Sequence, residues 1–287
     1  MEENNTTPQL PPLYIVTGAT DSMGSVIARR IAKQGKPLVL ASRDIAKAQR
    51  YCDKLKVETG NMDIQCLQLD LSSFALVNDF VARLKGLNRQ VYALVNNAGT
   101  LPRHSKLSPD GYEHTVQVNF LSTALLSLLV FPLMPENGRI ILSTSLSRRL
   151  VSLPYEFPAV SNFTQIGSYA QAKLALTLFS IYMSTVMKTH RVNVNCVNPG
   201  VVNSSVLVLH RWIERAPDYI LNPFPNPESG ITPTMRALES NDTGFIFQGS
   251  SSQVKASSLL KNRDVFIKLC NDTMRILKKH MPDEQAH

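Results

Sequence analysis

Residues 13–24 read LYIVTGATDSMG, a short apolar run that passes directly into a glycine-containing turn. The run predicts a buried strand, and the apolar spacing after the turn predicts a helix that ends at Gly35. A phosphate group can bind at such a place because glycines permit a tight turn and the helix start offers free N–H groups. The stretch therefore indicates a nucleotide site, although a turn that simply needs positive φ at Gly18 and Gly24 would contain the same glycines.

The alternation of strand and helix continues along the chain. We expect strands at 13–18, 37–42, 64–70, 91–99, 139–145 and 192–200, and helices at 44–59, 74–86, from Ser108 onward and at 165–188. Strands that alternate with helices imply an α/β fold with one parallel sheet covered on both faces. The prediction is a single-domain, Rossmann-type doubly wound sheet, with ligands at the carboxyl ends of its strands.

The chain has 287 residues, of which 44% are hydrophobic, enough to bury one large core. Residues 1–12, MEENNTTPQLPP, are polar and proline-rich, and we interpret them as a flexible tail rather than a signal peptide. The remaining residues, 13–287, are expected to form one dinucleotide-binding catalytic domain. Within it we expect a substrate lid at about 201–235 and a C-terminal helix with a basic face at about 258–279.

Several classes of protein are disfavoured by composition. The four cysteines are scattered, which predicts reduced thiols and no metal site. The net charge of +8 comes with no base-reading motif, so no nucleic-acid partner is expected. The apolar stretch 116–134 is interrupted by polar residues and predicts a buried helix rather than a membrane span. We therefore expect a cytoplasmic protein, with a homodimer or homotetramer as a possible assembly.

The end of the second strand bears on the choice of dinucleotide. A carboxylate there would accept hydrogen bonds from a ribose 2′-OH and repel a 2′-phosphate. This chain instead has Ser42 and Arg43, and a guanidinium can grip a phosphate through two parallel hydrogen bonds. NADP(H) is therefore favoured over NAD(H), although Asp44 weakens the positive field and Arg43 can equally be a solvated surface residue.

Four motifs in order resemble the short-chain dehydrogenase/reductase family: TGATDSMG at 17–24, NNAG at 96–99, Tyr169-x-x-x-Lys173, and NPG at 198–200. The resemblance spans roughly residues 13–200. Further stretches are similar to the retinol dehydrogenase branch in particular, namely DGYEHTVQVNF at 110–120, YAQAKLALTLF at 169–179, TGFIFQGSSSQVK at 243–255 and a longer spacer before the tyrosine. One departure is Ser22, which stands where the family usually has a glycine.

The resemblance implies a catalytic set of Asn119, Ser145, Tyr169 and Lys173. Tyr169 would be the proton donor, and Lys173, one helical turn later, would lower the pKa of the phenol by roughly 1 to 3 units. Ser145 would hydrogen-bond the substrate oxygen, although Ser143 and Thr144 are close alternatives. Asn119 would hold a water in a proton relay, unless it is a satisfied core amide. Taken alone, a tyrosine and a lysine four residues apart are more often structural than catalytic.

The same resemblance implies a set of cofactor contacts. Asp70 would meet the adenine amino group, with a plain helix cap as the alternative reading. The expected cofactor-binding residues are Gly18, Thr20, Ser22, Met23, Gly24, Ser42, Arg43, Asp70, Leu71, Asn97, Ala98, Gly99, Tyr169, Lys173, Pro199, Gly200, Val202 and Ser204.

The substrate side is indicated by apolar residues in 146–164 and 201–235. Such walls suit a small lipophilic carbonyl or alcohol, for example a retinoid or a steroid, although the same residues can be core or a dimer surface. The leading hypothesis is an NADP(H)-dependent oxidoreductase. The alternatives are a non-catalytic dinucleotide-binding regulator or scaffold and, on the same fold, a different reaction such as that of an epimerase or dehydratase.

Overall fold

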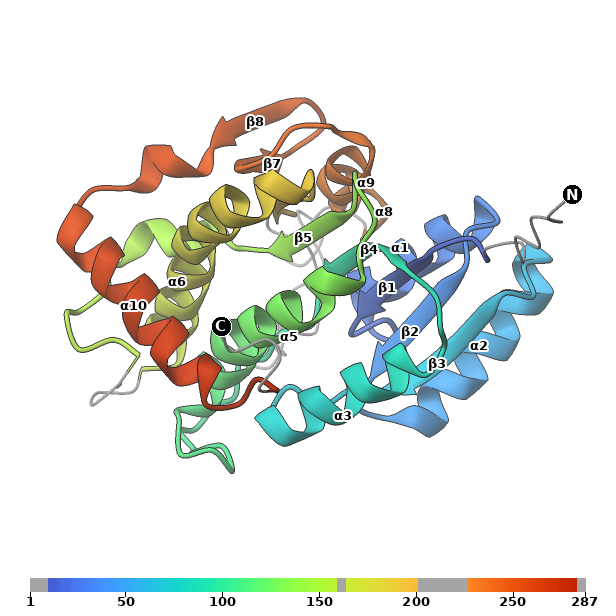
Figure 1. Ribbon diagram of the computed structural model, residues 1–287, viewed down its shortest axis with the longest axis horizontal. Helices are drawn as coiled ribbons and strands as arrows, with labels where there is room; N and C mark the ends of the chain where they lie inside the picture. Colours follow the sequence, from blue (N-terminus) through green and yellow to red (C-terminus); the bar gives the residue numbers. More distant parts are fainter. Residues whose placement is uncertain (1–9, 159–163, 201–226, 283–287) are drawn as a thin grey trace, which may run out of the picture.

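The computed structural model describes residues 10–158, 164–200 and 227–282. Within these ranges, eight strands form one sheet in the order β3-β2-β1-β4-β5-β6-β7-β8 (Figure 1). All neighbouring strands are parallel except β7 and β8, which pair antiparallel. The strands are β1 (Leu13–Thr17), β2 (Leu38–Ser42), β3 (Ile64–Gln68), β4 (Val91–Asn96), β5 (Arg139–Ser143), β6 (Asn193–Asn198), β7 (Phe245–Gln248) and β8 (Ser252–Lys255).

Helices cover both faces of this sheet. The main ones are α1 (Ser22–Lys33), α2 (Ile45–Thr59), α3 (Phe74–Lys85), α5 (Ser122–Val130), α6 (Gln165–Val186), α9 (Thr232–Glu239) and α10 (Arg263–Lys278). One hydrophobic cluster joins the sheet to α1, α2 and α9, and a larger one joins it to α3, α5, α6 and α10. Figure 1 shows α10 lying across α6, with which it is in contact. The doubly wound α/β prediction is confirmed.

Successive residues of a strand point to opposite faces of the sheet and so belong to different hydrophobic clusters. Ile15 and Val39 belong to the cluster with α3, α5 and α6, whereas their neighbours Val16 and Leu40 belong to the cluster with α1 and α2. All five residues of β2 are buried, as expected for a central parallel strand with helices on both sides. The apolar run at 38–42 therefore corresponds to a strand without an exposed face.

Two helix starts were predicted too early, and one hairpin was missed. The helix expected from Ser108 begins with α4 (His114–Val116), because the Ser108 N–H bonds the Tyr112 carbonyl in a loop and the Glu113 carboxylate caps the helix. The C-terminal helix begins at Arg263 rather than about 258, because Asn262 caps it and 256–259 form a separate 3₁₀ turn. Strands β7 and β8 were not expected.

The predicted tail and lid are only partly described. Residues 1–9 lie outside the described residues, and Pro11 accepts a 3.1 Å hydrogen bond from Arg89 Nε. Of the predicted lid, residues 201–226 also lie outside them. The described remainder forms α8 (Pro227–Gly230) and the start of α9, which packs on β5, β6 and β7.

One described stretch, His114–Leu133, is long and apolar enough to cross a membrane, with a mean hydropathy of 1.8. It comprises α4, a five-residue π-turn (Gln117–Leu121), α5 and a short 3₁₀ turn. Of its most apolar window, 83% is buried inside the protein. Core helices of globular domains have the same properties, and α5 packs here against α3 and β4.

Candidate active site

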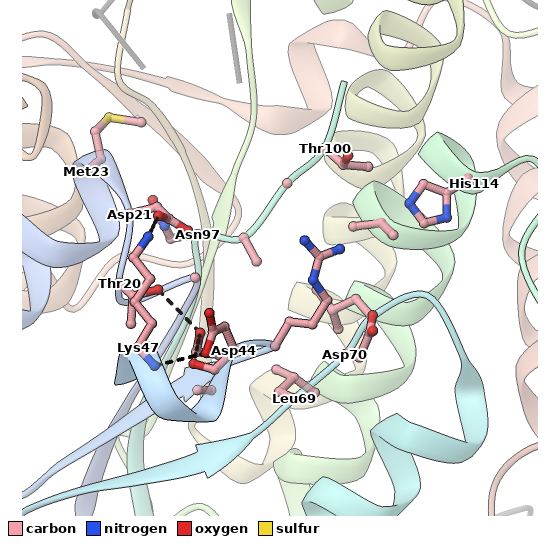
Figure 2. Close-up of a pocket in the computed structure, with 18 residues that line it drawn as sticks. Thr20, Asp21, Met23, Asp44, Lys47, Leu69, Asp70, Asn97, Thr100 and His114 are labelled. Atoms are coloured by element: carbon pink, nitrogen blue, oxygen red, sulfur yellow. Dashed lines mark hydrogen bonds and ion pairs between the residues drawn. The ribbon is translucent and has the colours of Figure 1, made fainter. Parts of the chain in front are cut away.

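A cavity of about 360 Å³ opens at the carboxyl ends of β1, β2, β3 and β4 (Figure 2). Ten predicted cofactor residues line it: Gly18, Thr20, Met23, Ser42, Arg43, Asp70, Leu71, Asn97, Ala98 and Gly99. Eight further lining residues were not predicted: Asp21, Ala41, Asp44, Lys47, Leu69, Thr100, His114 and Val118. The cavity therefore lies where a doubly wound sheet is expected to bind its ligand.

The turn after β1 leaves no room for side chains at its two glycines. Gly18 has φ +62°, and a Cβ added there would lie 3.1 Å from the Ala98 Cα. A Cβ at Gly24 would lie 2.0 Å from the Gly18 carbonyl oxygen and 2.6 Å from Asn97 Nδ2. The backbone therefore approaches the cavity bare, with the start of α1 directly behind it. Ser22 is the first residue of α1.

The NNAG segment ties the end of β4 to the end of β1. Asn97 Nδ2 donates to the Thr17 carbonyl at 3.2 Å, and the Ala98 N–H donates to Thr17 Oγ1 at 3.0 Å. Because these bonds fix the floor of the cavity, Asn97 has a structural role whether or not a ligand is present. Thr17 at the end of β1 and Asn97 after β4 are therefore the polar residues that hold the two strand ends together.

The end of β2 brings polar and charged groups to the cavity. Ser42 Oγ lies 3.3 Å from Thr20 Oγ1, and the exposed Arg43 lines the cavity. Asp44 is occupied as the cap of α2, where its Oδ1 accepts the Lys47 N–H at 2.9 Å. The side chains of Asp44 and Lys47 still line the cavity, so its charge is mixed rather than purely positive.

Asp70 forms a turn after β3. Its Oδ1 accepts the Ser72 N–H at 2.9 Å. Asp70 does not cap α3, because Ser73 holds the cap position and Asp110 Oδ2 accepts the Phe74 N–H at 2.8 Å. Its carboxylate therefore lines the cavity instead, across from His114 in Figure 2.

Burial lowers the pKa of His114 below its usual value, with the positive charge of Lys106 acting in the same direction. The shift favours the neutral imidazole, which has one hydrogen-bond donor and one acceptor.

Lys173 is buried beside Tyr169 on α6. Its side chain is 3% exposed, its Nζ donates to the Ser143 carbonyl at 2.8 Å, and the same Nζ lies 5.7 Å from the centroid of the Tyr169 ring. Burial lowers the pKa of Lys173 from 10.5 to about 8. A buried lysine with a single carbonyl partner is rare outside functional sites.

The pKa of Tyr169 shifts in the opposite direction from the one expected. Burial raises it to about 12, and a hydrogen bond with the Ser145 side chain opposes the rise. The expected lowering of this pKa by Lys173 is wrong. Removal of the phenol from water is the largest cause of the shift, and the Lys173 ammonium donates to the Ser143 carbonyl instead.

The three hydroxyls at the end of β5 have different surroundings. Thr144 Oγ1 lies 2.7 Å from Thr177 Oγ1 in the core, and the Ser143 carbonyl is the acceptor for Lys173. Ser145 is partly exposed, is hydrogen-bonded to Tyr169, and accepts from Ser147 Oγ at 3.0 Å. Ser145 is therefore the hydroxyl that the fold leaves beside the tyrosine.

Asn119 lies in the π-turn between α4 and α5 and is completely buried. Its Oδ1 accepts the Thr100 N–H at 3.0 Å, and its Nδ2 donates to the Thr100 carbonyl at 2.8 Å. The amide is thus satisfied by the segment that follows β4, as in the alternative reading of this residue. A Cβ added at Gly99 would lie 2.8 Å from Asn119 Oδ1 and 3.7 Å from Lys173 Nζ, so the cavity edge reaches both side chains.

The NPG segment follows β6, where Gly200 has φ +79° and donates its N–H to Asn198 Oδ1 at 3.2 Å. Pro199 and Gly200 are not part of the described lining of the cavity, and Val202 and Ser204 lie outside the described residues. Most of the missed lining residues had a readable signal, because each stands next to a predicted one in the sequence: Asp21, Ala41, Asp44, Leu69 and Thr100. Lys47 stands in the first turn of α2, four residues after Arg43. His114 had no such signal, since only the fold brings it to the cavity.

A model of the short chain dehydrogenase family matches residues 13–211. The chain is 31% identical over 238 residues to polyprenol dehydrogenase of Mus musculus, with 78% of this chain and 71% of the relative aligned. It is 30% identical over 215 residues to retinol dehydrogenase 11 of Homo sapiens, with 72% and 67% aligned. These relatives support the retinol dehydrogenase branch as the most similar part of the family.

Solved structures share the fold. A short-chain dehydrogenase from Sphingobium yanoikuyae in complex with NADPH superposes with a TM-score of 0.64 at 20% identity, covering 83% of this chain and 87% of that one. An oxidoreductase from E. coli, yciK, superposes with a TM-score of 0.67 at 20% identity, covering 84% and 95%. At this level of identity the likeness concerns the architecture of the sheet and its helices.

Proposed function

The chain belongs to the short-chain dehydrogenase family, and from that membership we propose that it is an NADP(H)-dependent oxidoreductase acting on a lipophilic alcohol or carbonyl compound. The observation that best supports the proposal is that the cavity reaches two residues of the predicted catalytic set, Asn119 and Lys173, at Gly99. This residue lines the cavity and lies against both Asn119 Oδ1 and Lys173 Nζ. A dinucleotide bound in the cavity would reach the side chains of the predicted catalytic set.

The residues at the cavity fit such a cofactor. The absence of space for a Cβ at Gly24 and the positive φ of Gly18 leave backbone N–H groups next to the start of α1, where a pyrophosphate binds. When bound, the nicotinamide supplies or accepts the hydride. Arg43 at the end of β2 supports the choice of NADP(H), because its guanidinium lines the cavity and the neighbouring carboxylate, Asp44, is engaged in capping α2.

The chain's own residues would handle the substrate oxygen and the proton. Because the pKa of Tyr169 is raised to about 12, the phenol keeps its proton at neutral pH and is a donor suited to carbonyl reduction. Ser145, hydrogen-bonded to Tyr169, would hold the substrate oxygen next to that donor. Lys173 would orient the phenol and hold the ribose, and Asn119 fixes the segment at Thr100, which would border the bound cofactor.

The segments that flank Ser145 and Tyr169 in the sequence contain exposed apolar side chains, which would suit a lipophilic substrate. Leu150 is 76% exposed, Tyr155 60% and Ile166 63%, and all three lie in the segments that flank the two polar residues. Relatives named for polyprenol and retinol, both long apolar alcohols, agree with this substrate class.

A second candidate is a non-catalytic dinucleotide-binding regulator. The raised pKa of Tyr169 favours it, since burial disfavours the phenolate that alcohol oxidation requires. The departure at Ser22 from the usual glycine points the same way. The two candidates differ in turnover, not in binding.

The test is to incubate the purified chain with NADPH or NADH and a panel containing retinal, a polyprenal and a steroid ketone, while following nicotinamide absorbance. We expect oxidation of NADPH in preference to NADH, and a Tyr169→Phe variant that loses roughly a hundredfold or more of the rate while still binding NADPH. Tyr182→Phe, a change on the same helix, is the matched control and keeps the rate. NADPH binding without any turnover supports the regulator, whereas an active Tyr169→Phe variant contradicts the proposed acid.

A further inference from the structure

Asp21 occupies the N-cap position of α1 without capping it. Its backbone is extended, with φ −125° and ψ 142°, and its carbonyl accepts the Ser25 N–H at 3.3 Å, as an N-cap residue should. Its carboxylate nevertheless makes no capping hydrogen bond. Asp44, Thr164 and Asn262 hold the same position on α2, α6 and α10, and each of these side chains does cap its helix.

The Asp21 carboxylate is instead engaged by Lys47. Figure 2 shows its side chain reaching from the first turn of α2 to Asp21, where the ammonium hydrogen-bonds and ion-pairs with the carboxylate. The backbone of Lys47 is fixed at the same time, because its N–H donates to Asp44 Oδ1 at 2.9 Å. Both Asp21 and Lys47 line the cavity. The carboxylate that would cap α1 is therefore held to one side of it.

The first turn of α1 is where a pyrophosphate would find N–H donors and the positive end of the helix dipole. A carboxylate that capped this turn would occupy those donors and add negative charge at the same point. We propose that Lys47 is a positioning residue that holds the Asp21 carboxylate away from α1 and so keeps the turn available for the pyrophosphate of a dinucleotide. The inference rests on the proposed function, since it takes the cavity to bind a dinucleotide.

The ion pair is not a major part of the fold. The side chains of Lys47 and Asp21 are 45% and 57% exposed, and pairs so accessible to water contribute little to stability. Substitution of either residue therefore leaves a folded protein whose binding can be measured. The competition between a released carboxylate and the pyrophosphate is expected to weaken dinucleotide binding roughly three- to tenfold, the size of a capping interaction with its dipole contribution.

The experiment titrates NADPH and NADH into wild-type protein and into four variants: Lys47→Met, Lys47→Arg, Lys47→Met/Asp21→Ala and Lys47→Met/Asp21→Asn. Lys47→Met should lose affinity for both dinucleotides by the same factor, and Lys47→Arg should retain it. Alanine at position 21 cannot cap, so that double variant should recover the wild-type affinity. Asparagine caps as well as aspartate does but carries no charge, so that double variant should stay weak.

Other results overturn the inference in distinct ways. A loss for NADPH alone that Asp21→Ala does not rescue would make Lys47 a direct ligand of the 2′-phosphate. Equal recovery in the two double variants would mean that net charge alone matters, and unchanged affinity in Lys47→Met would remove any role for the pair. Arg43→Ala, expected to affect NADPH only, is the control for the 2′-phosphate end. If wild-type protein binds neither dinucleotide, the proposed function itself fails.

Discussion

Gly24 is fixed by a lack of space rather than by its backbone angles. A Cβ there would lie 2.0 Å from the Gly18 carbonyl oxygen, a distance that the backbone cannot accept without moving α1 away from β1. We expect Gly24→Ala to lower the free energy of unfolding by about 1–3 kcal/mol, as overpacking does, and to abolish dinucleotide binding. Urea denaturation and an NADPH titration measure the two effects.

Gly35 provides the control for this change. It has φ +66° but no atom within 4 Å of an added Cβ, and it lies at the far end of α1. Gly35→Ala should therefore cost about 1 kcal/mol through backbone strain and leave binding intact. Wild-type NADPH affinity in Gly24→Ala would show that the close approach at this turn is not needed.

The roles of single residues could be predicted where a local backbone pattern requires them. They were harder to predict where elements distant in the sequence come into contact. The glycine turn and the pair on α6 follow from local patterns. The contact between Asp21 and Lys47 joins two elements that only the sheet brings together, and no local rule predicts it. The pKa of Tyr169 was mispredicted because a pair of charges was weighed without the burial that dominates it.

At the level of elements, the strands flanked by helices were predicted correctly and the last hairpin was missed. Strands β7 and β8 are four residues each, and Gly249 with its neighbours connects them, so neither has a long apolar run. The helix that begins at His114 was predicted to begin at Ser108, because serine is a common N-cap residue. The cap is instead the Glu113 carboxylate, which accepts the Val116 N–H. The helix start was therefore decided by a local cap at Glu113, and the hairpin by pairing of β7 with β6 and β8.

The π-turn before α5 contains Asn119, and its contacts lead to a testable prediction. Asn119 holds the segment after β4 through two hydrogen bonds to the Thr100 backbone. Asn119→Leu leaves the Thr100 N–H and carbonyl without these partners, and we expect a loss of about 1–3 kcal/mol in the free energy of unfolding together with faster hydrogen exchange at the Thr100 amide.

Asn119→Asp is the matched variant for this change. It keeps an acceptor for the Thr100 N–H but loses the donor to the Thr100 carbonyl, so the protection of that amide should be partly retained. Exchange at Thr100 that is as slow in Asn119→Leu as in the wild type would contradict the assigned role of the asparagine.

For the whole molecule, Lys173 makes stability depend on pH. Burial lowers its pKa from 10.5 to about 8, so between these values the unfolded chain holds a proton that the folded protein has lost. The free energy of unfolding therefore rises with pH in this window, and below about pH 8 both states are protonated. Relative to Lys173→Met, wild-type protein should gain stability from pH 8 to 10, by at most about 1.4 kcal/mol per pH unit.

Urea denaturation of both proteins between pH 7 and 10 measures this difference. The range stops at pH 10 because Tyr169, whose pKa is raised from 10.0 to about 12, contributes in the opposite sense above it. Between about pH 10 and 12 the Tyr169 phenol of the unfolded chain loses its proton while that of the folded protein keeps it, so the free energy of unfolding falls with pH. A difference between the two proteins that is constant from pH 7 to 10 would contradict a buried, titrating lysine.

The first strand of the chain lies in the interior of the sheet, between β2 and β4. Leu13 and Val16 pair with Val91 and Val95, so β1 is complete on both edges only after β4 has been made. At the usual speed of a ribosome, roughly four to sixteen seconds separate the synthesis of β1 from that of β4. During this interval a nascent chain has an apolar strand with one open edge, and its yield in a cell depends on whether another chain or a chaperone meets that edge first.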